Sequence, residues 1–522
     1  LPDLGDNVKC GNSLIGPDYF EAQLLPDEEE MRRVNPFDWE AEFPEVFLPS
    51  PAGGRGAGGE GGFDCVISNP PYIRIQTMKE WAPTEVEFYK QRYAAASKGN
   101  YDIYVVFVER ALQLLNEQGR MGYILPHKFF QAKYGHPLRE LLAGGKHLAE
   151  IVHFGDQQVF TGATTYTCLL FLDKGSNKRF RYIKAHDLDG WRANGEAVEG
   201  EIRADRVTGK EWNFVVGPGV PLFERLSEMP VKLGDMAHIF VGLQTSADTV
   251  FLFKEHEKVN TETTRAYSKR LDQYIELESD LLKPVVRSGN IGRFWARPTA
   301  LVLFPYKLVE GKFKLIPENE MMCDFSKTWE YLIANKKLLS GREHGKFRGI
   351  GWYQLYPKNL DIWEQPKIML PYMITQLSAY YDESDWYFVN VTTGGFGVTA
   401  DEQHGTLRYI TGLLNSKLLD WFMKQVSTNF HGGYFAANKQ FLVQLPIRTI
   451  NFDDPADVAR HDRMVTLVER MLALHRKLAA ATIPADKNLY QRQIEATDRQ
   501  IDALVYELYG LGEEEVGVVE GM

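Results

Sequence analysis

The chain has 522 residues with 44% hydrophobic and 25% charged side chains, a composition that indicates a globular protein of two or three domains. Its net charge of −11 excludes a basic coat over the whole surface, although it does not exclude local cationic patches. No apolar segment reaches membrane-spanning length, no signal peptide is visible, and the four cysteines lack disulfide or metal-ligand spacing, so we expect a cytoplasmic protein with no metal site and no membrane contact.

The amino-terminal segment contains one polar turn with a candidate role. Residues 6–14 are predicted to form a short strand that ends in Gly11-Asn12-Ser13. From the residues alone, this is either an ordinary turn or a ligand-binding turn. Further along, the glycine-rich residues 50–62 lead into a strand and lack the Lys-Ser/Thr ending of a phosphate-binding loop, so we predict a flexible loop there.

The most informative stretch follows at residues 63–72. Its apolar centre, residues 65–67, is predicted to be a buried strand that stops at Pro70 and Pro71, because proline cannot donate to a sheet. Asn69 then lies at the carboxyl end of the strand, where open α/β sheets bind ligands. The Asn69 side-chain oxygen, the Pro70 carbonyl and the Tyr72 ring together suit a planar group that bears an NH2.

The following segments alternate between helical and strand patterns. Apolar residues at helical spacing predict helices over residues 101–115 and 133–142, with a strand over 121–126 between them. Residues 152–172 are predicted to form a strand, a turn and a second strand. This alternation is typical of an α/β domain.

Residues 63–72 resemble the catalytic motif of the amino-methyltransferases that use S-adenosyl-L-methionine to methylate the exocyclic amine of adenine in DNA. The resemblance implies that Asn69 and the Pro70 carbonyl accept the two amine hydrogens, that Pro71 fixes the turn and that Tyr72 stacks on the base. It also implies that Phe160 stacks on the opposite face of a base extruded from the duplex. The alternative for Phe160 is an ordinary core aromatic.

The same family assigns the cofactor site to three residues of this chain: Asn12, Ser13 and Asn69. The sequence pattern of residues 38–47, followed by the catalytic strand, resembles that of type IIG restriction–modification enzymes, in which methylation and cleavage share one polypeptide. The family's glycine-rich cofactor loop and a nuclease cluster are not found in this sequence. We therefore expect this chain to be the carboxyl-terminal part of a longer polypeptide, either monomeric or continuous with that missing amino-terminal region. On this interpretation Mg2+ serves only a nuclease that this chain lacks.

From about residue 220 the pattern changes to short β-rich runs, which resemble the target-recognition domain of type IIG enzymes. The predicted strands cover residues 237–241, 249–253, 300–305, 367–370 and 386–391. Residues 421–451 contain no acidic side chain, and this segment is the best candidate for a surface that faces double-stranded DNA. The candidate DNA-binding residues are Lys424, His431, Lys439 and Arg448, and a plain basic loop is the alternative.

The tail is predicted to be a helical hairpin, with two amphipathic helices separated at residues 482–486. It is expected to brace the recognition domain, or else to bind a partner helix. The predicted domains are 1–220, an incomplete Rossmann-like α/β methyltransferase domain; 221–450, a β-rich α+β target-recognition domain; and 451–522, the hairpin.

Three functions fit these observations. The first is a sequence-specific DNA adenine N6-methyltransferase within a type IIG restriction–modification enzyme. The second is a DNA-specificity module that binds without catalysis. The third is a protein-glutamine methyltransferase, since that family uses a similar Asn-Pro-Pro-Tyr turn on an amide NH2.

Overall fold

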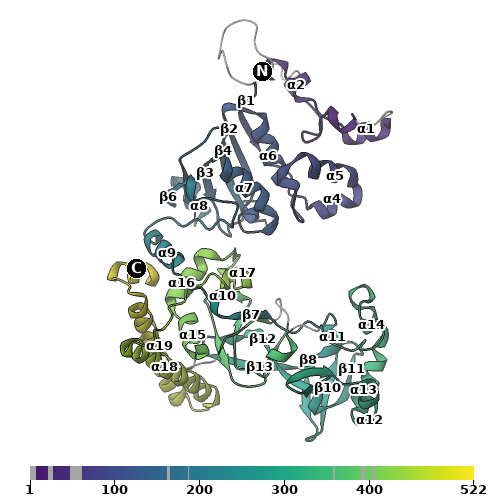
Figure 1. The fold of residues 1–522 in the computed structure, drawn as a ribbon, viewed down its shortest axis with the longest axis vertical. Coiled ribbons are helices and arrows are strands. Elements are labelled where there is room, and N and C mark those ends of the chain that lie inside the picture. The colour runs from purple at the N-terminus through teal and green to yellow at the C-terminus, as the bar shows by residue number, and fades with distance from the viewer. Residues whose placement is uncertain are drawn as a thin grey trace. The chain divides into compact units, whose positions relative to one another are not determined.

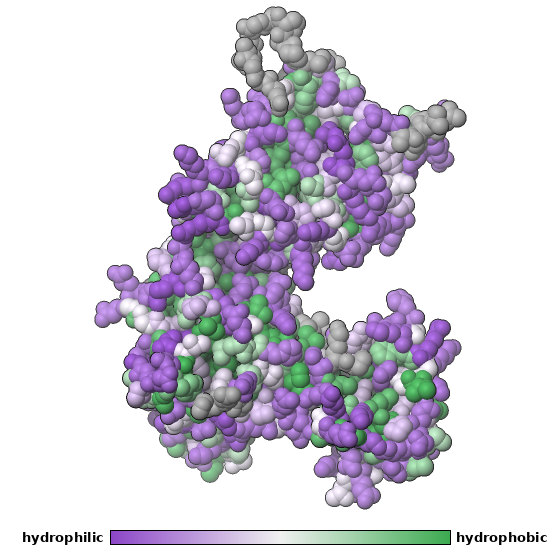
Figure 2. Space-filling view, viewed as in Figure 1, coloured by the Kyte–Doolittle hydropathy of each residue, from purple (hydrophilic) through white to green (hydrophobic). Residues whose placement is uncertain are grey.

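The chain forms two compact units, residues 1–220 and 221–522 (Figure 1). The computed structural model describes residues 7–21, 27–47, 61–160, 165–185, 187–356, 359–389, 394–401 and 406–521. The loop predicted from the glycine-rich run lies largely outside these residues. On the face shown in Figure 2, hydrophilic residues predominate in each unit, and hydrophobic residues are visible mainly as small groups among the hydrophilic ones.

The first unit is built on a six-stranded mixed sheet with the spatial order β1-β2-β4-β3-β5-β6. Its strands are β1 (Phe63–Ser68), β2 (Leu115–Pro126), β3 (Leu148–His153), β4 (Thr167–Asp173), β5 (Arg179–Lys184) and β6 (Val198–Arg203). β1 is parallel to β2 and β3 is parallel to β5, while β4 runs antiparallel to both of its neighbours. The strand–turn–strand predicted over residues 152–172 is confirmed as β3 and β4.

Helices flank this sheet and complete the α/β arrangement. They are α1 (Glu28–Val34), α2 (Trp39–Glu42), α3 (Pro44–Phe47), α4 (Ile75–Trp81), α5 (Pro83–Arg92), α6 (Tyr104–Leu114), α7 (His136–Gly144) and α8 (Leu188–Asn194). The two predicted helices are confirmed as α6 and α7. α6 connects β1 to β2 and buries Tyr104, Val105 and Val108 completely in the core of the unit.

Two strand predictions in this unit are wrong. β1 was expected to be buried, but it lies at the edge of the sheet and pairs only with β2, so that Ile67 is 81% exposed. Residues 8–10 form no strand; instead Asn12 makes a single bridge with Pro36. Among the described residues, no second strand pairs with β1, and no strand pairs with residues 8–10.

The described residues of the second unit form five small sheets. Their strands are β7 (His238–Val241), β8 (Leu252–Phe253), β9 (His256–Lys258), β10 (Thr263–Ser268), β11 (Gln273–Glu278), β12 (Leu282–Gly292), β13 (Trp295–Leu303), β14 (Tyr306–Val309), β15 (Lys312–Leu315), β16 (Lys367–Pro371), β17 (Met373–Ile374), β18 (Tyr380–Asp382), β19 (Tyr387–Phe388), β20 (Gly395–Thr399), β21 (Asn429–Phe430) and β22 (Tyr434–Ala436). Four of the five predicted strands are found. The fifth, over residues 249–253, is mostly a helical turn.

The helices of this unit include the predicted hairpin, α18 and α19. They are α9 (Val220–Ser227), α10 (Leu233–Met236), α11 (Asp248–Phe251), α12 (Glu318–Asp324), α13 (Ser326–Ala334), α14 (Lys336–Gly345), α15 (Thr406–Leu414), α16 (Lys417–Val426), α17 (Lys439–Leu442), α18 (Pro455–Ala480), α19 (Pro484–Tyr509) and α20 (Glu513–Glu520). Pro484 occupies the first turn of α19, a position that proline tolerates. Of the helices in the described part of the chain, none combines the length and the apolar character needed to cross a membrane.

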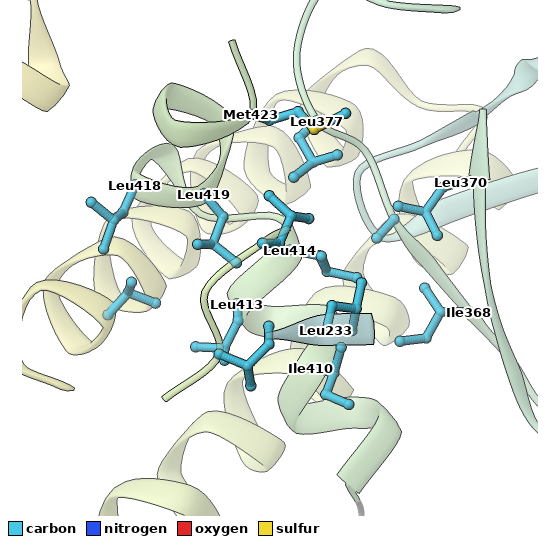
Figure 3. Close-up of a cluster of buried hydrophobic side chains, with 14 of the residues drawn as sticks. Leu233, Ile368, Leu370, Leu377, Ile410, Leu413, Leu414, Leu418, Leu419 and Met423 are labelled. Atoms are coloured by element: carbon cyan, nitrogen blue, oxygen red, sulfur yellow. The ribbon is translucent and has the colours of Figure 1, made fainter. Parts of the chain in front are cut away.

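The hairpin shares one hydrophobic core with the elements that precede it. Helices α15 and α16 contribute most of the side chains in Figure 3 and pack against β16 and the hairpin. The labelled residues of this cluster are Leu233, Ile368, Leu370, Leu377, Ile410, Leu413, Leu414, Leu418, Leu419 and Met423. A Cβ on Gly412 would lie 2.4 Å from the Met464 sulfur, so glycine allows α15 to approach α18 closely.

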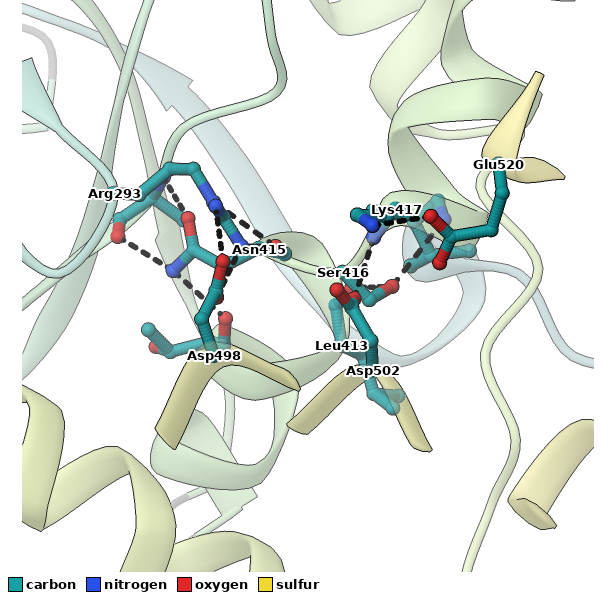
Figure 4. Close-up of polar contacts among 11 residues, drawn as sticks. Arg293, Leu413, Asn415, Ser416, Lys417, Asp498, Asp502 and Glu520 are labelled. Atoms are coloured by element: carbon teal, nitrogen blue, oxygen red, sulfur yellow. Dashed lines mark hydrogen bonds and ion pairs between the residues drawn. The ribbon is translucent and has the colours of Figure 1, made fainter. Parts of the chain in front are cut away.

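Polar contacts also join the hairpin to this core (Figure 4). Arg293, in the turn between β12 and β13, binds both carboxylate oxygens of Asp498 on α19 at 2.8 and 2.5 Å and donates to the Asn415 carbonyl. One turn along α19, Asp502 accepts the backbone N–H of Lys417 at 2.9 Å, at the start of α16. These contacts support the prediction that the hairpin braces this unit.

We expect Asp502→Asn to stabilise the second unit at neutral pH. Burial raises the pKa of Asp502 to about 6, against an ordinary value near 3.8. The folded state therefore binds this proton more tightly than the unfolded state, and stability falls as pH rises from about 4 to 6, by about 2–3 kcal/mol. The amide can still accept the Lys417 N–H without burying a charge.

Urea denaturation of both proteins across this pH range tests the expectation. The wild type should lose stability between pH 4 and 6, and Asp502→Asn should lose about 1–3 kcal/mol less. Identical pH profiles for the two proteins would rule out a buried, ionising Asp502.

Candidate active site at the carboxyl end of the sheet

The sheet of the first unit brings the ends of three strands to one edge. β1 and β2 are parallel, and β3 has the same direction because both β2 and β3 are antiparallel to β4. The carboxyl ends of β1, β2 and β3 therefore meet at the same edge, and β4 begins there. Ligands of open α/β sheets bind at such an edge.

The Asn69–Tyr72 turn leaves this edge directly after β1. The Tyr72 hydroxyl donates to the Asn69 side-chain oxygen at 2.7 Å and lies 3.1 Å from the Ile124 carbonyl on β2. Asn69 and Pro71 are exposed, Pro70 is buried and Tyr72 is half-buried. The Tyr72 hydroxyl therefore holds the Asn69 carboxamide with its oxygen toward the ring. Since a carbonyl oxygen has two lone pairs, it can accept a second hydrogen bond.

Tyr72 is a neutral donor at physiological pH. Burial raises its pKa to about 12, and the nearby Cys168 thiol adds to the shift. Its ring meets the Tyr104 ring edge-on, with centroids 6.3 Å apart. The phenol is thus fixed by one aromatic contact and by a hydroxyl that lies between two acceptors, the Asn69 side chain directly after β1 and the Ile124 carbonyl on β2.

Phe160 lies in the segment that joins β3 to β4, so the topology places it at the same edge as Asn69. Its side chain is half-buried. Among the described residues, its ring has no aromatic contact with Tyr72, and residues 161–164 next to it are outside the described part of the chain. A role in base stacking stays a prediction.

A histidine cluster at this edge was not predicted from the sequence. His127 directly follows β2, and the centroids of the His127 and His153 rings lie 4.2 Å apart. The His127 Nε2–H donates to the Gly155 carbonyl at 3.2 Å. Burial lowers the pKa of His127 to about 4, so the imidazole is neutral at pH 7. The signal was present, since Pro126-His127 ends a predicted strand just as Ser68-Asn69 does.

Two of the three residues proposed to bind the cofactor, Asn12 and Ser13, sit in a turn separate from Asn69. The Asn12 side-chain oxygen accepts the Leu14 N–H at 3.2 Å, and the Ser13 carbonyl accepts the Trp39 indole N–H at 3.2 Å. Within the described residues, Asn12 and Asn69 share no hydrogen bond. No three His, Cys, Asp or Glu side chains of the described chain are close enough together to hold a metal ion.

Three of the four candidate DNA-binding side chains are engaged inside the second unit. Lys424 pairs with Asp420 at 2.8 Å, Lys439 donates to the Ile239 carbonyl at 2.8 Å, and Arg448 binds both oxygens of Asp457 at 2.9 and 3.0 Å. These contacts favour structural roles for the three cations. His431 is exposed in the turn between β21 and β22. DNA binding by these four residues stays a prediction.

Comparison with known protein families finds matches in both units. Residues 4–160 match the Eco57I restriction-modification methylase family, and residues 320–447 match the TaqI-like C-terminal specificity domain. The chain is 27% identical to the type II restriction enzyme and methyltransferase RM.Eco57I of Escherichia coli over 100% of its own length and 51% of that protein. The chain is homologous to type II restriction–modification methyltransferases.

Further relatives agree with this assignment. The type II methyltransferase M.PaeR7I of Pseudomonas aeruginosa is 24% identical over 88% of this chain and 73% of its own length. Among solved structures, the type IIL restriction-modification enzyme MmeI in complex with DNA has a TM-score of 0.54 and 11% identity, covering 87% of this chain and 56% of MmeI. That likeness supports the fold alone. The chain spans about half the length of RM.Eco57I.

Proposed function

We propose that this chain is the methyltransferase and DNA-specificity part of a type IIG restriction–modification enzyme, and that it methylates the exocyclic N6 amine of adenine in double-stranded DNA. The observation that supports this most directly is the Asn69–Tyr72 turn at the carboxyl end of β1, where Asn69 is exposed and its oxygen is oriented by Tyr72. The homology to type II methyltransferases and to a specificity domain supports the same assignment.

The proposed role of Asn69 and Pro70 is to prepare the amine for attack. The lone pair of an aromatic amine is delocalised into the ring, which makes the nitrogen a poor nucleophile. Two oxygen acceptors that bind the two amine hydrogens favour a pyramidal nitrogen and localise its lone pair. The Asn69 side-chain oxygen and the Pro70 carbonyl supply these acceptors, and Pro71 fixes the turn.

The methyl donor in this proposal is S-adenosylmethionine, which supplies a methyl group on a sulfonium. The candidate residues for holding it are Asn12, Ser13 and Asn69. Asn12 fits this role because its side-chain oxygen, which accepts the Leu14 N–H, can accept one more hydrogen bond from an amine. The part of the first unit that the structure describes offers no glycine-rich cofactor loop.

Base extrusion is proposed because the target amine is unreachable inside the stacked duplex. Tyr72 and Phe160 would hold the extruded base between them. We expect Tyr72→Ala and Phe160→Ala each to weaken capture of the base by about 1–3 kcal/mol, the usual contribution of one stacking aromatic.

This expectation can be measured with duplex DNA that carries 2-aminopurine at the target position. The fluorescence of the analogue should rise on binding to the wild type, and should rise less with either variant at equal DNA occupancy. Phe154→Leu, a change in the buried core at the end of β3, serves as a control for nonspecific damage. Equal brightening with all proteins would contradict the stacking roles.

Methyl incorporation distinguishes the proposal from its alternatives. With tritiated S-adenosylmethionine, label should enter duplex DNA at N6 of adenine. Label in protein would instead identify a protein-glutamine methyltransferase. If the chain binds specific DNA but shows no affinity for the labelled cofactor, it is a specificity module without catalysis.

A further inference from the structure

A cavity of about 840 Å3 lies within the second unit, away from the residues discussed so far. Its walls come from the β12–β13 turn and the start of β13, from β18 and the segment after it, from the end of α18 and from the start of α19. The side chains that matter for the argument are Trp295, Arg297, Tyr380, Trp386, His475 and Arg476. A volume of this size is within the range of small-molecule sites.

Five Phe, Tyr and Trp side chains line the cavity, and three of them carry the argument. Tyr380 and Trp386 stack on each other, with centroids 5.7 Å apart and planes 19° apart. Trp295 is 39% exposed, which is unusual for such a large apolar ring. A Cβ on Gly292 would lie 2.2 Å from the Trp295 indole nitrogen, so the ring lies close against this backbone. These rings offer flat surfaces for a planar ligand.

Two of the lining side chains are cations with unused hydrogen-bond donors. Arg297 is exposed and forms no hydrogen bond or ion pair with any residue that the structure describes. Toward the described residues, Arg476 donates through Nε alone, to the Leu472 carbonyl of its own helix at 3.3 Å. The acidic Glu383 in the same wall is paired with Arg408. The cavity wall therefore presents two arginine side chains whose remaining donors are available to a ligand.

The histidine in the cavity wall is neutral, and the wall that holds Trp295 is anchored to the hairpin. Burial and the nearby Arg293 charge together lower the pKa of His475 to about 4, so the ring is uncharged at pH 7. Arg293 itself ties the β12–β13 turn to Asp498 on α19 through two hydrogen bonds (Figure 4). The wall that holds Trp295 is thereby anchored to the wall formed by the hairpin.

We propose that this cavity binds a nucleotide, with the base stacked on the exposed aromatic rings and the phosphate held by Arg297 and Arg476. Arginine suits this role because its guanidinium donates two parallel hydrogen bonds to phosphate oxygens. The nucleotide is either a free mononucleotide or one nucleotide of a single strand. The proposal goes beyond methyl transfer and does not depend on it, since no residue of the Asn69–Tyr72 turn is involved.

The test measures binding of N-methylanthraniloyl-AMP to the full chain by fluorescence anisotropy, with unlabelled AMP, adenosine and a short thymidine oligonucleotide as competitors. Arg297→Ala with Arg476→Ala should weaken AMP binding at least about tenfold, and Trp295→Ala at least about fivefold. Arg492→Ala is the matched control, because Arg492 is exposed on α19 but does not line the cavity. It should change affinity less than about twofold.

The competitors identify the phosphate contact and the source of the nucleotide. AMP should displace the probe far better than adenosine. Displacement by the oligonucleotide at lower nucleotide concentration than AMP identifies a strand-binding site, whereas displacement by AMP alone identifies a free-nucleotide site. Equal affinity in all variants, or equal competition by AMP and adenosine, would overturn the proposal. A failure of millimolar AMP to displace the probe would also overturn the proposal.

Discussion

Asn69→Ala is expected to lower the rate of methyl transfer by about 100- to 1,000-fold, the usual effect of removing one preorganised polar contact to a reacting group. Without the Asn69 oxygen, the amine keeps only the Pro70 carbonyl as an acceptor, and its lone pair stays in the ring. DNA affinity and overall stability should change little, because the Asn69 side chain is exposed and bonds only to Tyr72 among the described residues.

Single-turnover methylation with tritiated cofactor measures this rate apart from binding. Asn116→Ala is a matched control, since Asn116 donates to Asp64 at 2.7 Å at the opposite end of the β1–β2 pair. This control should transfer methyl groups at a rate close to that of the wild type. If Asn69→Ala turned over as fast as Asn116→Ala, the acceptor role of Asn69 would be wrong.

The catalytic turn could be predicted because its chemistry is local. Two prolines and an asparagine within three residues fix where the strand stops and which polar group stands there. Hydrogen bonds with a distant partner could not be predicted in this way. The Tyr72 hydroxyl bonds to Ile124, which lies 52 positions away, so its contact with β2 becomes visible only once the sheet is assembled.

The same reason explains why the contacts at the candidate DNA surface could not be predicted. Lys439 and Arg448 stand in a segment with no acidic residue, so they were expected to be free for phosphate. In the fold, Lys439 reaches the Ile239 carbonyl, 200 positions earlier, and Arg448 reaches Asp457. Local charge counts describe which residues are near in sequence, whereas an ion pair depends on which residues are near in space.

The missed helix α11 shows a second limit. Residues 249–253 are β-branched and aromatic, which favours a strand. However, the Thr245 hydroxyl contacts Asp248 and accepts the Ala247 N–H at 3.1 Å, which satisfies backbone and side-chain groups at the start of a helical turn. Phe251 is then fully buried from the helix rather than from a sheet. The strand propensity is therefore realised only in Leu252 and Phe253, which form β8.

Lys367→Ala is expected to lower the free energy of unfolding of the second unit by about 3–5 kcal/mol, the usual cost of leaving one buried charge unpaired. Lys367 on β16 lies 2.8 Å from the Asp382 carboxylate on β18, and both side chains are 0% exposed. The ammonium also donates to the Trp363 carbonyl at 2.8 Å and the Ser384 carbonyl at 3.2 Å. Removing it strips three acceptors of their shared donor.

Urea denaturation measures the loss, and two further proteins separate its causes. Burial raises the pKa of Asp382 and the Lys367 charge opposes this shift, so the carboxylate alone should take up a proton as the pH falls. Lys367→Ala should therefore regain stability toward low pH. The double change Lys367→Met with Asp382→Leu leaves no lone charge and should cost much less.

Lys307→Ala breaks a half-exposed pair with Glu320 and should cost at most about 1 kcal/mol. Equal losses for Lys367→Ala and Lys307→Ala would show that burial of the Lys367–Asp382 pair does not decide its contribution.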